Sequence, residues 1–296
     1  MSENNEIKIA YLLLAHKNPE QVNLFVNQLL EYGDCDVYIH IDKKNQSMCD
    51  AIIKNEHVFV CSEYETKWAS FDICKAAVKL MELVRDSGRS YTHFYFGSGQ
   101  DLLVKSGLYE YLAEHSDRIF LRIIREVSKR DKASARYRIR WPRKLMISNN
   151  FHIYRFVRKG LQILCRMGIV IRRNNKTLKH EVKFYTGGTW FIAPIFILEY
   201  ILNYLEQNPD YFEFWEESLA SDLMFFQTII MNSPYSELVE NELMYIHWGD
   251  NHPLSVTIDD DAIIESGNYF CARKFEIDER DAIEYYLNKT KRGKEN

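Results

Sequence analysis

The sequence predicts an α/β fold with a largely parallel central sheet, and two observations carry this prediction. Continuous apolar runs such as Ile7 to Leu14 are typical of strands buried on both faces. Segments of helical length alternate with these runs. The chain has 296 residues, 46% of them hydrophobic, which is enough to bury a large core. We expect one domain, because no repeat, low-complexity segment or clear linker divides the chain.

In the first part of the chain, local sequence signals predict where the helices begin. Asn18-Pro19-Glu20 places a cap residue before a proline in the first helical turn. Ser70 and Ser106 are candidate caps of two further helices. The expected strands at 7–14, 37–41, 58–61 and 91–96 alternate with helices at about 18–32, 70–85 and 106–115.

The second part departs from this alternation. Residues 125–180 are expected to form a basic helical insertion that is mobile or applied to the surface. A turn at Gly187-Gly188-Thr189-Trp190 follows it. We then expect helices at about 194–207 and 218–231, a strand near 243–247 and a helix after Asp278.

Composition excludes several classes of protein. An aromatic content of 14% excludes disorder, although most of these rings belong in the core. No apolar run has the length of a membrane span, and acids stand where a signal peptide needs positive charge, so we expect a cytoplasmic protein. The six cysteines have no CxxC or metal-ligand spacing and are expected to be free thiols.

Charge is unevenly distributed. The net charge is −4, yet residues 117–180 hold 19 Lys/Arg against three acids. Such a segment suits an anionic partner, namely phosphates, a membrane surface or an acidic glycan. The pI of about 6.2 and the lack of a recognisable motif argue against nucleic acid. Residues 151–173 interleave apolar and basic residues without an acid, so they predict either a helix on an anionic bilayer or an ordinary packed helix.

Polar and aromatic residues follow the predicted strands. Ligands of parallel sheets bind beyond the carboxyl ends of strands. His16, Asp42, Trp68 and the loop Ser98 to Asp101 come at or near such ends. Each also has an ordinary interpretation: a loop histidine, a capping Asp, a packed Trp, and an Asp that holds its own loop through backbone amides instead of touching a sugar.

Three other sequence patterns give little support for a functional site. Asp34 and Asp36 spell DxD, but they precede their strand and are interpreted as turn residues. Gly97-Ser98-Gly99 matches neither a nucleophile elbow nor a dinucleotide fingerprint, although a serine hydrolase that uses Ser98 stays a rival hypothesis. Residues 259–261 are expected to form a solvated acidic turn.

Eight short stretches, spread over most of the chain, stand in the order in which one known family carries similar stretches. They are IAYLLLAHKNPEQV, VYIHIDKK, KWASFDICKAAVKLM, THFYFGSGQDLLVKS, GGTWFIAP, SDLMFFQTIIMNS, MYIHWGDNHP and FCARKF. Together they resemble the core-2/I-branching β-1,6-N-acetylglucosaminyltransferase family, which includes peptide xylosyltransferases. The basic middle segment is poorly covered.

The resemblance implies a GT-A-like glycosyltransferase of bacterial type that inverts the anomeric centre and needs no metal or other cofactor. In place of a metal-binding acid pair, such proteins carry a small-residue loop like Ser98-Gly99-Gln100-Asp101. A nucleoside diphosphate leaving group gains negative charge in the transition state, so basic side chains must stand in for the cation. Arg273 and Lys274 in FCARKF resemble the diphosphate-contacting stretch, although Lys274 could also be a solvated charge.

The resemblance also assigns other contacts. It puts Asp42 near the uracil, and Trp68 is a candidate wall of the nucleotide pocket. Trp248 resembles a residue that stacks on the acceptor sugar, and we expect Trp190 to contact the acceptor too. Packing in the core is the alternative for Trp248.

Two departures from the family pattern matter. Aligning residues 225–228 places Leu223, which cannot accept a proton, where the family has its Glu base. Asp222 beside it could act as the base or merely favour a helix N-terminus. Glu216 and Glu217 are rival bases, and an impaired enzyme is a further possibility. Leu254 stands where relatives often carry a basic residue, which places more weight on Arg273 and Lys274.

We therefore expect transfer of a sugar, N-acetylglucosamine foremost, from a UDP-sugar to a hydroxyl of a glycan or lipid-linked glycan acceptor. Surface polysaccharide assembly is the expected setting. The alternative is a catalytically impaired protein that binds a nucleotide sugar or glycan.

Overall fold

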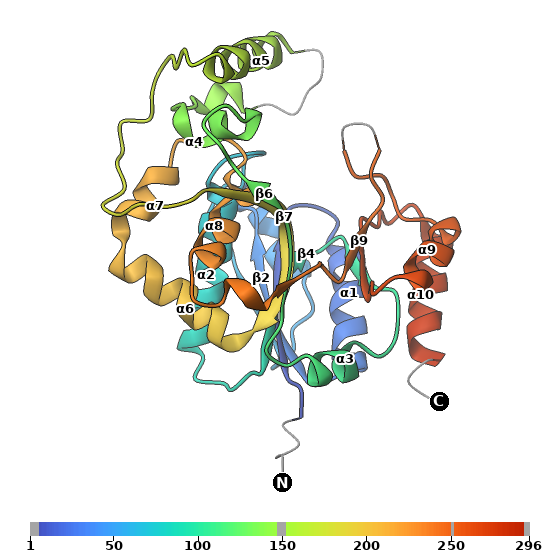
Figure 1. Ribbon diagram of the computed structural model, residues 1–296. Coiled ribbons are helices and arrows are strands. Elements are labelled where there is room, and N and C mark those ends of the chain that lie inside the picture. The colour runs from blue at the N-terminus through green and yellow to red at the C-terminus, as the bar shows by residue number, and fades with distance from the viewer. Residues whose placement is uncertain (1–5, 147–151, 250–251, 293–296) are drawn as a thin grey trace.

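A computed structural model describes residues 6–146, 152–249 and 252–292 (Figure 1). Its main feature is a seven-stranded sheet in the order β3-β2-β1-β4-β7-β6-β8. Only β7 runs antiparallel to its neighbours, which confirms the predicted α/β fold with a mostly parallel sheet. The strands are β1 (Ile9–Ala15), β2 (Cys35–Ile41), β3 (Val58–Cys61), β4 (His93–Ser98), β6 (Ile119–Glu126), β7 (Tyr185–Pro194) and β8 (Val239–Glu240).

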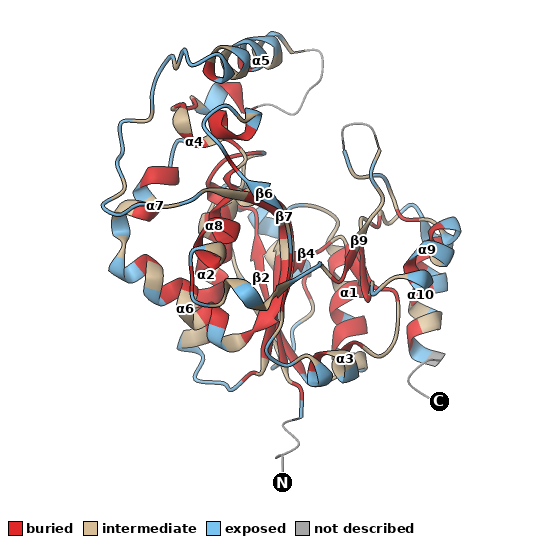
Figure 2. Ribbon diagram, in the orientation of Figure 1, coloured by how far each residue is buried: buried red, intermediate tan, exposed pale blue. Residues whose placement is uncertain are grey.

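Helices cover both faces of this sheet, and each face has its own core (Figures 1 and 2). Tyr11 and Leu13 of β1 belong to one core, whereas Ala10 and Leu12 belong to the other, which explains the unbroken apolar run. On the first face lie α1 (Pro19–Tyr32), α3 (Leu108–Glu114) and α10 (Arg280–Arg292); on the second lie α2 (Asp72–Asp86), α6 (Ile195–Gln207), α7 (Pro209–Trp215) and α8 (Phe225–Met231).

A second, smaller sheet brings two strands from the C-terminal part of the chain beside a short strand that follows β4. Its order is β5-β10-β9, formed by β5 (Asp101–Leu103), β10 (Cys271–Arg273) and β9 (Met244–Ile246). Arg273 pairs with Asp101 on one side and with Ile246 on the other. The stretch FCARKF therefore lies beside the loop that follows β4.

The basic middle segment extends beyond the sheet (Figure 1). It contains α4 (Ala135–Arg138) and α5 (Ile153–Arg166). A third, smaller core forms here, with Trp141 and Cys165 packed in a cluster that includes Ala69. One domain carrying an insertion stays our prediction for the organisation of the chain.

Short helical pieces complete the described structure. None of the described helices is long and apolar enough to cross a membrane. All six cysteines are free, as predicted. The remaining pieces are α9 (Asp261–Ser266) and the 3₁₀ segments η1 (Lys43–Ala51), η2 (Lys132–Ser134), η3 (Arg143–Leu145), η4 (Ser221–Leu223), η5 (Ser236–Leu238) and η6 (Ile258–Asp260).

Several local predictions are wrong. The stretch Gly187-Gly188-Thr189-Trp190 is no turn but part of β7. A Cβ atom on Gly187 would lie 2.0 Å from the carbonyl oxygen of Arg122, so this glycine serves a close approach of two strands. The helix predicted from residue 218 begins only at Phe225, after η4.

The predicted serine caps also fail. Ser70 donates to Asp72 from outside the helix, whose cap position is held by Phe71. The helix expected after Ser106 is preceded by Gly107, which has a positive φ of 89°. Asn18 stands at the predicted cap position but makes no side-chain capping bond.

The two acidic patterns also differ from expectation. Asp36 is not a turn residue but is fully buried in β2, where it accepts hydrogen bonds from Arg89 and Tyr91. Asp260 is likewise buried and completes a capping box with Thr257, so residues 259–261 are not a loose solvated turn.

Candidate active site

The carboxyl ends of β1, β2 and β4 meet the small sheet at one edge of the molecule. Backbone hydrogen bonds tie these ends together. The amide of Asp42 donates to the carbonyl of Ala15 (2.8 Å), and that of Gly99 donates to Leu14 (3.0 Å). The amide of Phe275 donates to Gln100 (2.8 Å), which fixes the C-terminal stretch against the β4–β5 loop.

Glu276 is the centre of a charged cluster at this edge. Its carboxylate accepts from the ammonium groups of Lys17 (2.8 Å) and Lys274 (2.9 Å) and from the amide of Gln100 (3.0 Å). Burial alone would raise the pKa of Glu276, but the two lysines lower it to about 2. Two ammonium groups and one carboxylate leave this trio of side chains with an excess of one positive charge.

Arg273 adds a third cation beside this cluster. Its side chain is only 11% exposed, and its guanidinium carbon lies 4.2 Å from the centre of the Trp190 ring. The Nε atom lies 3.7 Å from Asp101, and within the described part of the chain Nε and one terminal nitrogen have no hydrogen-bond partner. Buried donors of this kind are normally satisfied, so the site suits an anionic ligand.

Asp101 holds the loop in which it stands. It is fully buried and accepts from the Ser98 amide (2.7 Å), the Ser98 hydroxyl (3.0 Å) and the Tyr95 hydroxyl (2.8 Å). Burial raises the pKa of Asp101, while the Arg273 charge and these bonds oppose the rise. The geometry thus favours the alternative in which Asp101 holds its own loop over direct contact with a sugar. The Ser98 hydroxyl is engaged in the same set of hydrogen bonds.

Asp42 and His16 lie at the same edge. Asp42 is buried, and it accepts from the amide of Lys44 (2.9 Å) and the hydroxyl of Thr66 (2.6 Å), so its capping interpretation holds. His16 is exposed, yet its crowded surroundings and the neighbouring Lys17 lower its pKa. Asp42 and Glu276 act in the opposite direction on the same imidazole. Contact of either side chain with a nucleotide stays a prediction.

The three expected aromatic contacts lie in different settings. Trp68 is 49% exposed, with the Arg158 guanidinium 4.9 Å from its ring centre. Trp248 is 57% exposed, so the core alternative for it is wrong. Trp190 packs on Phe96, with 5.2 Å between ring centres, and lies under Arg273. Its position favours support of Arg273 over contact with the acceptor.

Asp222, the candidate base, lies in η4 just before α8. The Thr189 hydroxyl donates to its carboxylate (2.9 Å). Burial raises the pKa of Asp222, and the Thr189 bond and the nearby Arg136 charge act against this rise. A carboxylate with a raised pKa is a stronger base at neutral pH.

The rival acids are engaged elsewhere. Glu217 pairs with Arg140 at 2.5 Å, and Glu216 lies 3.6 Å from Lys75. Both carboxylates are exposed, so neither has the enclosed surroundings of Asp222.

Strand β7 connects the candidate base to the cation cluster. Thr189 holds Asp222, and the next residue, Trp190, holds Arg273. Because β4 and β7 are paired up to Phe96 and Phe191, these two residues come at the level where β4 ends. Both halves of the candidate site are therefore positioned by one strand.

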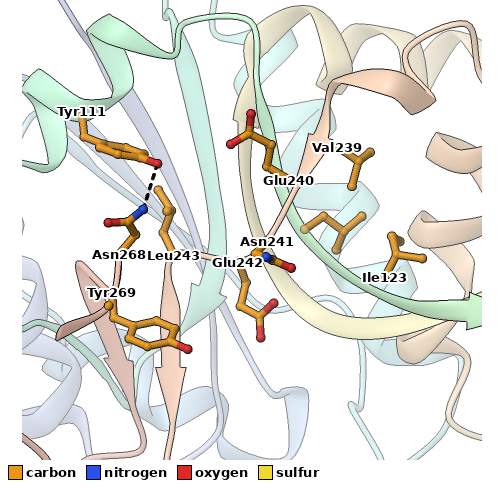
Figure 3. A pocket seen from close by; sticks show the side chains of 11 residues that line it. Tyr111, Ile123, Val239, Glu240, Asn241, Glu242, Leu243, Asn268 and Tyr269 are labelled. Atoms are coloured by element: carbon orange, nitrogen blue, oxygen red, sulfur yellow. Dashed lines mark hydrogen bonds between the residues drawn. The ribbon is translucent and has the colours of Figure 1, made fainter. Parts of the chain in front are cut away.

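A separate cavity of about 630 Å³ lies between the edge of the main sheet and the small sheet (Figure 3). Glu240, Glu242 and Tyr269 line it, and the Asn268 amide donates to the Tyr111 hydroxyl across one side (3.4 Å). None of the predicted site residues lines this cavity.

Sequence patterns pointed to only part of this site. Lys17 and Glu276 stand in the quoted stretches or directly beside them, yet neither was a candidate. Thr189 and Arg136 were also missed. A basic residue directly after a predicted strand, as in AHK, is the signal that could have revealed Lys17.

Among the described residues, no group of three His, Cys, Asp or Glu side chains could hold a metal ion.

The mostly parallel seven-stranded sheet with helices on both faces agrees with the GT-A-like fold that the sequence predicts. The family model named Core-2/I-Branching enzyme matches residues 9–266, and the chain belongs to this family. The match includes Asp222 and ends shortly before Arg273. A search of curated proteins found no match. Family membership makes this a glycosyltransferase with a nucleotide-sugar donor and a glycan acceptor.

Proposed function

We propose that this protein transfers a sugar, N-acetylglucosamine foremost, from a UDP-sugar to a hydroxyl of a glycan acceptor in surface polysaccharide assembly. The transfer inverts the anomeric centre and needs no metal. The observation that carries the proposal is the cluster of Lys17, Lys274 and Arg273 at the carboxyl ends of the strands. The choice of N-acetylglucosamine rests on the quoted sequence stretches.

The cations act on the leaving group. As the bond between C1 of the sugar and the diphosphate oxygen breaks, its electron pair stays on UDP. Lys17 and Lys274, already held in place by Glu276, offer ammonium donors to that growing charge. Arg273 contributes guanidinium donors that have no other hydrogen-bond partner among the described residues.

Asp222 acts on the acceptor. Its carboxylate takes the proton of the acceptor hydroxyl while the hydroxyl oxygen forms the new bond to C1. A single displacement at C1 inverts the anomeric configuration. Thr189 orients the carboxylate, and the enclosed surroundings raise its pKa toward the working range.

A binding protein without turnover is the second candidate function. Leu223 at the expected position of the base favours it, since a leucine cannot accept a proton. The setting of Asp222 favours the enzyme.

The test is release of UDP from a panel of UDP-sugars, with and without EDTA, in the presence of glycan acceptors. We expect turnover with at least one donor at the same rate in EDTA. Loss of turnover in EDTA that manganese restores would refute metal independence. UDP binding without turnover of any donor would identify the binding protein.

A further inference from the structure

Helix α5 has three different faces. Its inner face, formed by Tyr154, Arg158, Leu161 and Cys165, packs against the rest of the basic segment. Arg158 and Cys165 are buried. This contact fixes which side of the helix points outward.

The outer face is apolar and exposed, over α5 and the residues that follow it. Within α5 the positions 153, 156, 157 and 163 fall on one side of the helix, and three more exposed apolar residues follow its end. Contiguous exposed apolar surface of this kind marks an interaction site, whereas single exposed residues do not. The exposed fractions are 68% for Ile153, 62% for Phe156, 45% for Val157, 60% for Ile163, 70% for Met167, 53% for Ile169 and 46% for Ile171. Figure 2 shows α5 at the outer end of the molecule.

A basic stripe runs beside this apolar face. Arg155, Lys159 and Arg166 are spaced so that they lie together on the third side of α5, and Arg172 and Arg173 follow it. No acid stands between residues 131 and 181. The partner must therefore be apolar where it meets the helix and anionic beside it.

An anionic lipid bilayer has this combination of properties, because its acyl chains lie directly under its charged headgroups. A second copy of the chain fits less well. Its matching face would bring the same basic stripe and the same lack of acids to the contact.

The inner face of α5 connects this surface to the candidate active site. Arg158 stacks over Trp68, 4.9 Å from the ring centre. The next residue, Ala69, accepts a hydrogen bond at its carbonyl from the amide of Ala220 (2.7 Å), two residues before Asp222. The helix is thus braced against the segment that carries the candidate base.

We propose that the outer face of α5, together with residues 167–173, docks on an anionic bilayer. The apolar side chains enter the interface, and Arg155, Lys159 and Arg166 contact lipid phosphates. Docking places the base beside the membrane, where a lipid-linked acceptor presents its hydroxyl. The link to such an acceptor rests on the proposed function, whereas docking itself does not.

The test is flotation of the full chain, without donor or acceptor, on vesicles of phosphatidylcholine alone or mixed with phosphatidylglycerol. We expect binding only to the mixed vesicles, weakened by salt. The double variant Phe156→Ser, Ile163→Ser should lose it, while the matched control Ile258→Ser, Ile263→Ser, at exposed apolar positions outside α5, should retain it. Lys159→Gln should weaken binding about five-fold, the effect of one charge near the surface, and exposed Lys54→Gln should not.

Three results would overturn the proposal. The first is equal binding, or no binding, with both kinds of vesicle. The second is binding that the α5 variants leave unchanged. The third is a dimer in analytical ultracentrifugation that Phe156→Ser, Ile163→Ser dissociates, since that would make a second copy the occupant. Because no sugar is present, failure here is distinct from failure of the proposed transfer.

Discussion

At the scale of single residues, the candidate site depends on side chains whose charge is set by their neighbours. Lys274 and Lys17 share one carboxylate, and Asp222 is enclosed beside one threonine. The first arrangement prepares positive charge for an anionic ligand. The second prepares a carboxylate to accept a proton.

Lys274→Ala should weaken UDP binding by about 1.5–3 kcal/mol, the range for one lost charge-assisted hydrogen bond. Titration calorimetry with UDP measures this change, and exposed Lys54→Ala is the control. Unchanged affinity in a folded Lys274→Ala protein would remove this lysine from the site.

Asp222→Asn should lower kcat by about 10²–10⁴-fold and leave UDP affinity nearly unchanged, because the base faces the acceptor. Since the base works only when ionised and its pKa is raised, wild-type turnover should fall as pH drops through a value above the usual 3.8 of an aspartate. Glu216→Gln and Glu217→Gln are the controls and should leave kcat unchanged.

Leu223→Glu gives the reciprocal measurement. If Asp222 serves as the base, the new carboxylate should add nothing or interfere. A gain in turnover would instead show that residue 223 holds the position of the base and that the natural protein is impaired. Robust turnover in Asp222→Asn would also exclude Asp222.

At the scale of elements, the end of β4 and the loop that follows it pack closely, and Gly97 near the end of β4 permits this packing. A Cβ atom on Gly97 would lie 2.1 Å from the Tyr95 ring and 2.5 Å from Asp101. Tyr95 and Asp101 are bonded to each other, so neither can move away without breaking the loop's internal bonds.

Gly97→Ala should therefore lower the free energy of unfolding by roughly 1–3 kcal/mol, the usual cost of overpacking. Gly160→Ala is the matched control. Nothing lies within 4 Å of its new methyl group in α5, so it should raise stability by about 0.5–1 kcal/mol through helix propensity. Urea unfolding compares the two, and equal effects would contradict the close packing of the loop.

At the scale of the whole molecule, Glu276 connects segments far apart in the chain. Lys17 follows the first strand, Gln100 lies in the β4–β5 loop, and Lys274 follows β10. Because its folded pKa of about 2 lies below the ordinary value of 4.5, the ionised carboxylate stabilises the folded state.

That stabilisation should be fully present above about pH 4.5 and lost as pH falls toward 2. Glu276→Gln should lower the free energy of unfolding by roughly 1–3 kcal/mol near neutral pH, and the difference from wild type should shrink over this window. Urea unfolding at a series of pH values measures it. A difference that does not depend on pH would contradict the charged cluster.

Local sequence patterns were enough to predict the first four strands with the helices between them, a mostly parallel sheet, and the edge at which polar residues gather. The apolar runs were long enough to show these elements, as β1 at Ile9–Ala15 illustrates. The quoted stretches also led to the correct family. Such local patterns need only neighbouring residues.

The assembly of the site followed only from the three-dimensional arrangement of the chain. A strand of three residues such as β10 has too little periodicity to predict, yet it brings Arg273 beside Asp101. Glu276 meets Lys17 across 259 positions of the chain. Trp190 supports a cation because β7 runs through what the sequence predicted as a turn. Contacts between distant segments depend on how sheets pack, and no local pattern records them.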